Sequence, residues 1–152
     1  MPFGGAPRMF DFVPDAERLS HIFSQATAPT FFLGAVAGFV SLMVSRLSAV
    51  MQRARDLNAI DEDDHARIPL KADLDRLRLR ARFLNSGILA ALRAGLCATV
   101  LLAIIFLTEF VGLKYSYGAG LIFVAATGFL GFALLRFAQE ARIGLNEADE
   151  HQ

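Results

Sequence analysis

The chain has 152 residues, of which 55% are hydrophobic and only 20% charged, and its 15 basic residues balance its 15 acidic ones. Soluble domains average about 45–50% apolar and about 25% charged residues, so this composition excludes a disordered chain, a collagen-like repeat and a globular enzyme of usual size. With zero net charge, the chain lacks the overall excess of basic charge that is typical of nucleic-acid-binding proteins. It has a single cysteine, Cys97, which excludes a scaffold held together by disulfide bonds. These numbers indicate a small integral membrane protein.

The N-terminal residues 1–25 are expected to form a tail with a short amphipathic helix. Apolar side chains at Leu19, Ile22, Phe23 and Ala26 follow the i, i+3, i+4, i+7 spacing of one helical face. This helix either lies on the membrane surface or begins the first span. The first 25 residues lack the charged start and apolar core of a cleavable signal peptide.

Three apolar stretches follow, at residues 26–45, 94–113 and 118–136. A helix needs about 20 residues to cross the hydrocarbon core. Backbone polar groups without hydrogen-bond partners are very costly in lipid, so each stretch is expected to be α-helical. We therefore predict an all-α polytopic membrane protein with a three-span domain over residues 26–145 and a C-terminal tail at 146–152.

The connection between the first two spans, residues 46–93, is rich in arginine, whereas the short connection between the second and third spans carries only Lys114. Basic residues near span ends favour the cytoplasmic side. This pattern predicts a cytoplasmic long connection, an N-terminus outside and a cytoplasmic C-terminus.

The long connection itself has helical periodicity. An acidic run at 61–65 and Pro69 separate two heptad-type seams. The seam residues are Leu47, Val50, Ala54 and Leu57 before the turn and Leu70, Leu74, Leu77, Ala81, Leu84 and Ile88 after it. We predict a cytoplasmic antiparallel helical hairpin that extends spans one and two. Because such short seams are marginal alone, a neighbouring subunit would steady them, which favours a homo-oligomer.

Arginines in the hairpin and at the span ends are candidate contacts for lipid headgroups or a partner protein. They are Arg46, Arg53, Arg55, Arg80, Arg82, Arg93 and Arg136. The alternative is ordinary anchoring by snorkelling side chains. Arg93 would lie inside the membrane if span two began at Phe83, and an intramembrane arginine indicates function.

Glu109 is a candidate polar site inside the membrane, where a carboxylate could bind a cation, carry a proton or pair across subunits. The alternative is an interfacial residue that pairs with Lys114. No sequence motif of a hydrolase, metalloprotease or phosphate loop is present, and the three histidines are dispersed. We therefore predict no catalytic, cofactor-binding or metal-binding residues, no cofactor and no enzymatic activity.

Two stripes of small residues on the first and third spans are typical of helix packing, within or between subunits. They are Thr30, Gly34, Gly38 and Ser41 on span one and Gly120, Thr127 and Gly131 on span three.

Three blocks of the chain, together spanning about residues 26–145, resemble a bacterial membrane family catalogued as domain of unknown function 2721. The glycine-rich N-terminal tail does not align to the family. The matching positions are Pro29, Phe32, Leu33, Arg46, Leu47, Arg53 and Arg55 in the first block, Leu77, Arg80, Arg82 and Asn85 in the second, and Phe137, Glu140 and Arg142 in the third. The resemblance implies a bacterial membrane protein and supports the predicted topology, in the inner membrane with the N-terminus periplasmic and the C-terminus cytoplasmic, but it leaves the function open.

The leading hypothesis is a non-catalytic oligomerising or accessory protein whose arginine-rich hairpin docks lipid headgroups or a partner protein. It would bind membrane lipids, form a homo-oligomer or join a larger membrane complex, and bind no nucleic acid. The alternative is a small oligomeric channel or transporter subunit, with Glu109 and the arginines at the cytoplasmic ends lining a path.

Overall fold

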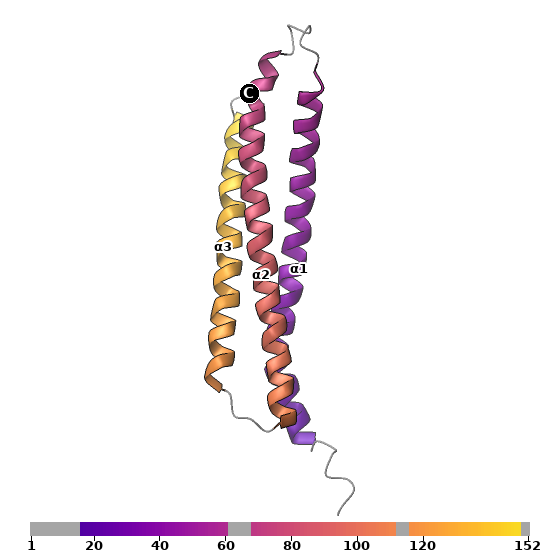
Figure 1. The fold of residues 1–152 in the computed structure, drawn as a ribbon, viewed down its shortest axis with the longest axis vertical. Coiled ribbons are helices and arrows are strands. Elements are labelled where there is room, and N and C mark those ends of the chain that lie inside the picture. The colour runs from indigo at the N-terminus through magenta and orange to yellow at the C-terminus, as the bar shows by residue number, and fades with distance from the viewer. Residues whose placement is uncertain (1–15, 61–67, 112–115, 150–152) are drawn as a thin grey trace, which may run out of the picture.

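The computed structural model describes residues 16–60, 68–111 and 116–149, and this part of the chain is all-helical. Three long helices, α1 (Ala16–Asn58), α2 (Leu74–Val111) and α3 (Ser116–Asp149), lie side by side, and a short 3₁₀ helix, η1 (Ile68–Asp73), precedes α2 (Figure 1). Each long helix is long and apolar enough to cross a membrane. The predictions of an all-α fold and of three helices able to span a membrane are confirmed.

The first helix is continuous from Ala16 to Asn58 and runs through Pro29. The amphipathic stretch before the first span therefore begins α1 rather than forming a separate surface helix; residues 1–15 lie outside the described part. Near the proline, the hydroxyls of Thr27 and Thr30 donate hydrogen bonds of 2.7 Å to the carbonyls of Phe23 and Ala26. Such bonds satisfy hydroxyl groups inside the helix itself, as an apolar environment requires.

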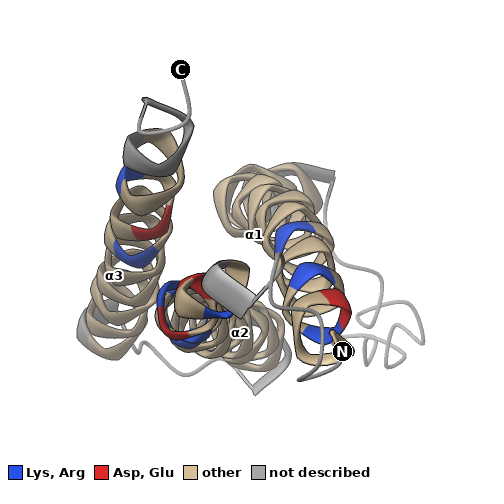
Figure 2. Cartoon of the chain, turned by 90° about the horizontal axis from the view of Figure 1, so that it is seen from above, with Lys and Arg blue, Asp and Glu red and all other residues tan. Residues whose placement is uncertain are grey.

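The central helix is α2, which packs against both α1 and α3, whereas α1 and α3 meet at few places (Figure 2). Small residues on α2 allow this close double packing. Those that are buried are Gly87, Ala90, Ala91, Ala94 and Ala98. At Gly87 a Cβ atom would collide with Cε of Met43 and lie 3.3 Å from Cβ of Arg136, so only glycine fits without movement.

Beyond the apolar spans, α1 and α2 continue to pack against each other. Almost all the residues of the predicted seams pack in one cluster, in which Val50, Leu77 and Leu84 are buried. The exceptions are Leu70 and Leu74, which are not part of this cluster. Leu70 is 45% exposed and belongs to η1, whose three residues per turn do not follow a heptad. Residues 61–67, which would close the predicted hairpin, lie outside the described part, and the side of the membrane stays a prediction.

In the described part of the chain, the glycines of the small-residue stripes on α1 and α3 make no close contact with another helix. A Cβ added at Gly34, Gly38, Gly120 or Gly131 would meet no atom within 4 Å. Packing of these stripes between subunits stays a prediction.

Candidate functional site

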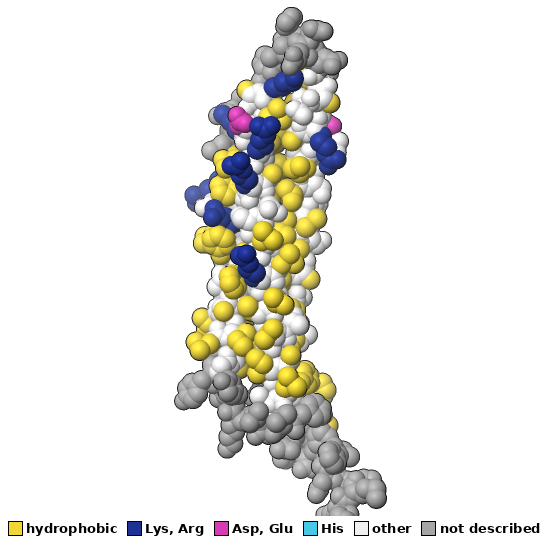
Figure 3. All heavy atoms as spheres, in the orientation of Figure 1, with side chains coloured by type: hydrophobic (Ala, Val, Ile, Leu, Met, Phe, Trp, Pro, Cys, Tyr) yellow, Lys and Arg dark blue, Asp and Glu magenta, His cyan; other side chains and the backbone are white. Residues whose placement is uncertain are grey.

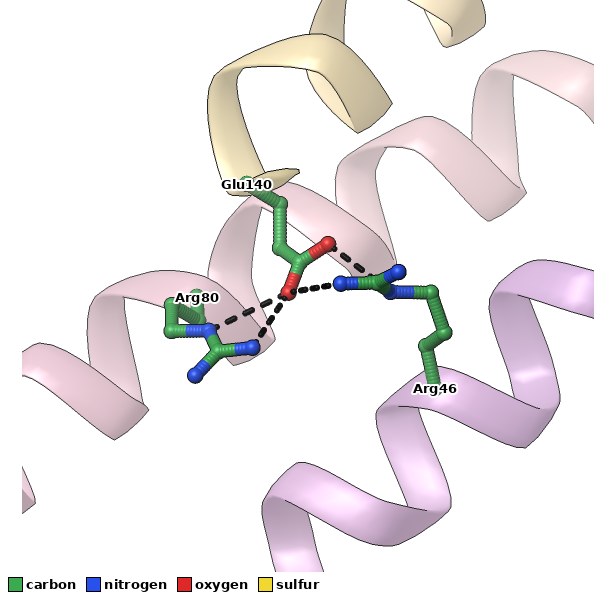
Figure 4. A network of polar contacts seen from close by, with 3 residues as sticks. All are labelled: Arg46, Arg80 and Glu140. Atoms are coloured by element: carbon green, nitrogen blue, oxygen red, sulfur yellow. Dashed lines mark hydrogen bonds and ion pairs between the residues drawn. The ribbon is translucent and has the colours of Figure 1, made fainter. Parts of the chain in front are cut away.

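One side chain from each long helix contributes to a buried group of charges, which we call the ionic cluster: Arg46 of α1, Arg80 of α2 and Glu140 of α3 (Figure 4). Arg80 donates two hydrogen bonds to Oε1 of Glu140, from Nη2 at 2.8 Å and from Nε at 3.1 Å. Arg46 donates from Nη2 to the same oxygen at 3.4 Å, and its Nε lies 3.1 Å from Oε2. Both arginines therefore engage a single carboxylate.

Aromatic contacts between α1 and α3 lead up to this cluster. Phe32, Phe39 and Arg46 are spaced by seven residues on α1, about two turns, so they share one side of the helix. The Phe32 and Phe123 rings are 5.9 Å apart and the Phe39 and Phe137 rings 5.5 Å apart. The guanidinium carbon of Arg46 lies 5.4 Å from the centre of the Phe137 ring. This cation–π contact helps to orient Arg46 towards α3.

A glycine makes room for the second arginine. Gly144 lies one turn beyond Glu140 on α3, and a Cβ at this position would be 3.0 Å from Nη2 of Arg80. The guanidinium of Arg80 can therefore approach the α3 backbone closely while it bonds to Glu140.

Burial makes the cluster energetically important. The side chain of Glu140 has no exposed surface, that of Arg80 is 14% exposed and that of Arg46 is 39% exposed. A carboxylate removed from solvent must be paired and hydrogen-bonded, since an isolated charge there is very costly. Oε2 accepts no hydrogen bond of good geometry in the described part of the chain, so Arg46 supports it by charge alone. Two cations and one anion leave the cluster with one net positive charge.

A third arginine lies one turn before Glu140 but outside the cluster. Arg136 donates from Nη1 to Oε1 of Gln139 at 3.1 Å. Its guanidinium carbon lies 4.8 Å from the Phe132 ring and 5.6 Å from the Phe83 ring, and its buried Nε has no hydrogen-bond partner in the described part of the chain. Arg136 is thus held between α2 and α3.

The other predicted arginines lie on the surface. Arg53 and Arg55 are exposed on α1, and Arg82 and Arg93 are exposed on α2. In the face seen in Figure 3, basic side chains gather over the half of the molecule nearest the α1–α2 turn, and the other half is mostly hydrophobic. The structure therefore divides the seven predicted arginines into two cluster residues, one held between helices and four exposed.

The proposed intramembrane site at Glu109 is not tested. Glu109 belongs to the last turn of α2, but its side chain lies outside the described part of the structure. Among the described residues, no group of histidine, cysteine and acidic side chains is arranged to hold a metal ion.

Glu140 was missed as a site residue in the sequence, where it stood only among the positions that carry the family resemblance. One signal was available: it is the sole acidic residue between Glu109 and Glu147. Its neighbours Arg136 and Arg142 suggest a local pair along α3, but the carboxylate bonds to arginines of the other two helices instead.

Three apolar helices of spanning length, joined by a buried ionic cluster, indicate a multi-pass membrane protein. Residues 26–149 match the family described as protein of unknown function (DUF2721), and because this match covers most of the chain, the chain belongs to that family. The resemblance seen in the sequence is confirmed. The chain matches no curated protein and no solved structure. Each of the three blocks that carried the resemblance contributes one residue to the ionic cluster.

Proposed function

We propose that this chain is a non-catalytic scaffold or accessory protein of the bacterial inner membrane. In this proposal the parts of α1 and α2 beyond the ionic cluster, residues 47–58 and 74–79, form a cytoplasmic extension. The extension docks an acidic surface of a partner protein, and the chain acts as a homo-oligomer or as a subunit of a larger membrane complex.

The observation that carries the proposal is the position of the ionic cluster at the base of this extension. Arg46 follows the charge-free stretch 19–45 of α1, and Glu140 lies one turn past Arg136, which ends the charge-free stretch 115–135. In this proposal the cluster therefore lies outside the hydrocarbon, at the level of the headgroups. Because the cluster joins all three helices, it holds the extension at a fixed orientation to the spans.

Distance along the helix favours a protein as the partner of the far arginines. Arg53 and Arg55 lie seven and nine residues past Arg46, about 10–13 Å at the helical rise. The headgroup region adds only about 5–8 Å to each side of the hydrocarbon core. Both exposed arginines thus extend past the headgroups, where they can meet an acidic protein surface.

The alternative hypothesis, a channel or transporter subunit, is supported by no specific contact among the described residues. One of the arginines that would line its path, Arg46, is bonded to Glu140.

The test reverses charge on the extension without touching the cluster. Arg53→Glu with Arg55→Glu is compared with Arg142→Glu, an exposed arginine of α3 near the same end. A photo-crosslinking amino acid in place of Gln52 reports contact with a partner in native membranes. We expect the double variant to lose the crosslinked product and the control to keep it. The proposal would be overturned if the crosslinked product still formed in the double variant, or if it were lost equally in the control.

A further inference from the structure

The surface of α2 that faces away from α1 carries two exposed arginines, Arg82 and Arg93. They are eleven residues apart, about three helical turns, so they lie on the same side of the helix. Leu84 is buried in the hydrophobic contact between α1 and α2, and it lies about 160–180° away from both arginines around the helix. The two arginines therefore point away from α1.

Arg136 of α3 reaches the same region from the neighbouring helix. Its guanidinium carbon lies 5.6 Å from the ring of Phe83, the residue that follows Arg82. Its Cβ lies 3.3 Å from the point where a Cβ of Gly87 would be. Along α2, Arg136 is thus level with the stretch between Arg82 and Arg93.

No carboxylate neutralises these three arginines within the described part of the chain. Arg136 donates to the neutral amide of Gln139, and Glu140 is occupied by the ionic cluster. The sequence of α2 has no acidic residue between Asp75 and Glu109. Three positive charges therefore remain available to an anion on one surface.

The side chains beside and below these arginines are apolar. Leu89, Leu96 and Val100 are exposed on the same side of α2. In Figure 3 the lowest basic side chain of the visible face is surrounded by hydrophobic ones. An occupant of this surface must be anionic at one end and hydrocarbon along the rest, which describes a phospholipid with net negative charge.

We propose that this surface, formed by Arg82, Arg93 and Arg136, binds an anionic phospholipid. The phosphate lies between the arginines, whose guanidinium groups suit bidentate bonding to phosphate oxygens, and an acyl chain runs along Leu89 and Leu96. Arg93 is six residues past Gly87 towards the middle of the span, about 9 Å deeper, and extends back to the phosphate from below. This inference goes beyond the proposed docking function and uses different residues; it shares only the placement in the membrane.

The test is native mass spectrometry of the full chain in detergent with phosphatidylglycerol, phosphatidylcholine or inorganic phosphate added. We expect phosphatidylglycerol to bind in preference to phosphatidylcholine. Each arginine near a membrane surface strengthens binding of anionic lipid about fivefold, so Arg82→Gln with Arg93→Gln should weaken phosphatidylglycerol binding about 25-fold. Both side chains are exposed, and an unchanged melting temperature checks that the variant keeps the fold.

The matched control is Arg53→Gln with Arg55→Gln, which removes the same charge from the far part of α1. This control should bind phosphatidylglycerol as the natural chain does. Binding by the Arg82–Arg93 variant within twofold of the natural chain, or an equal loss in the control, would overturn the proposal. Full displacement of phosphatidylglycerol by inorganic phosphate would also overturn it, because the site would then recognise a free anion rather than a lipid.

Discussion

Replacing Glu140 with glutamine tests whether the ionic cluster stabilises the bundle. Glu140→Gln keeps the shape and one acceptor oxygen but removes the carboxylate charge that pairs with Arg80, whose side chain is only 14% exposed. Removing one partner of a buried ion pair costs about 3–5 kcal/mol. Arg46, at 39% exposed, regains part of its hydration, which lowers the expected loss in free energy of unfolding to about 2–4 kcal/mol.

A double-mutant cycle separates this interaction from other effects of the substitution. We expect Glu140→Gln and Arg80→Gln to have a coupling free energy of about 1.5–3 kcal/mol, measured by reversible unfolding with a denaturing detergent in mixed micelles. The matched control is the exposed pair of Arg78 and Asp75, which lie 3.3 Å apart with side chains 66% and 90% exposed. Exposed pairs contribute little, so Arg78→Gln with Asp75→Asn should show a coupling of about 0.5 kcal/mol or less.

The dependence of the coupling free energy on salt also distinguishes the buried pair from the exposed pair. Solvent ions screen exposed charges far more than buried ones, so the Glu140–Arg80 coupling should persist at high ionic strength. Additive effects of Glu140→Gln and Arg80→Gln, with a coupling no larger than that of the exposed pair, would refute the reasoning.

Three further predictions follow from the packing and topology. Gly87→Val should lower the free energy of unfolding by about 1–3 kcal/mol, because the valine side chain overpacks against Met43. Adding Met43→Ala should restore part of this loss in the same unfolding assay. Equal stability of Gly87→Val and the natural chain would contradict the packing. Gly34→Leu with Gly38→Leu should not lower the unfolding midpoint of the monomer, since a Cβ at either position would meet no neighbouring atom within 4 Å in the described part of the chain and leucine favours a helix more than glycine does. A loss of oligomer mass in native mass spectrometry would locate a subunit contact there. Gln52→Cys, in a chain whose natural cysteine has been removed, should react with a membrane-impermeant thiol reagent only from the cytoplasmic side; reaction from the periplasmic side would reverse the predicted orientation.

The spans and the packing of their extensions could be predicted because both depend on local periodicity. The heptad spacing of residues such as Val50, Leu77 and Leu84 places them on one side of each helix, and they do pack together. A charge-free run of about 20 residues similarly defines a helix able to cross the bilayer without reference to its neighbours.

The ionic cluster could not be predicted because it depends on which helix lies in the middle. Arg46 and Arg80 were interpreted as outward contacts for lipid or a partner, but they point towards Glu140. The glycine pattern of α1 was the more visible packing signal, yet alanines on α2 and Gly87 carry the packing. Small residues tolerate close approach wherever they occur, so only the three-dimensional arrangement shows which are used.

The ionic cluster also imposes an order on biogenesis. Glu140 lies 60 residues after Arg80 and 94 after Arg46 in the chain, so a ribosome exposes both arginines well before their carboxylate exists. Until α3 has been inserted, Arg46 of α1 and Arg80 of α2 lack the carboxylate that binds both of them in the finished bundle. A nascent chain that stops short of Glu140 therefore lacks the carboxylate that pairs with arginines of both earlier helices. Completion of the final helix is what closes the fold.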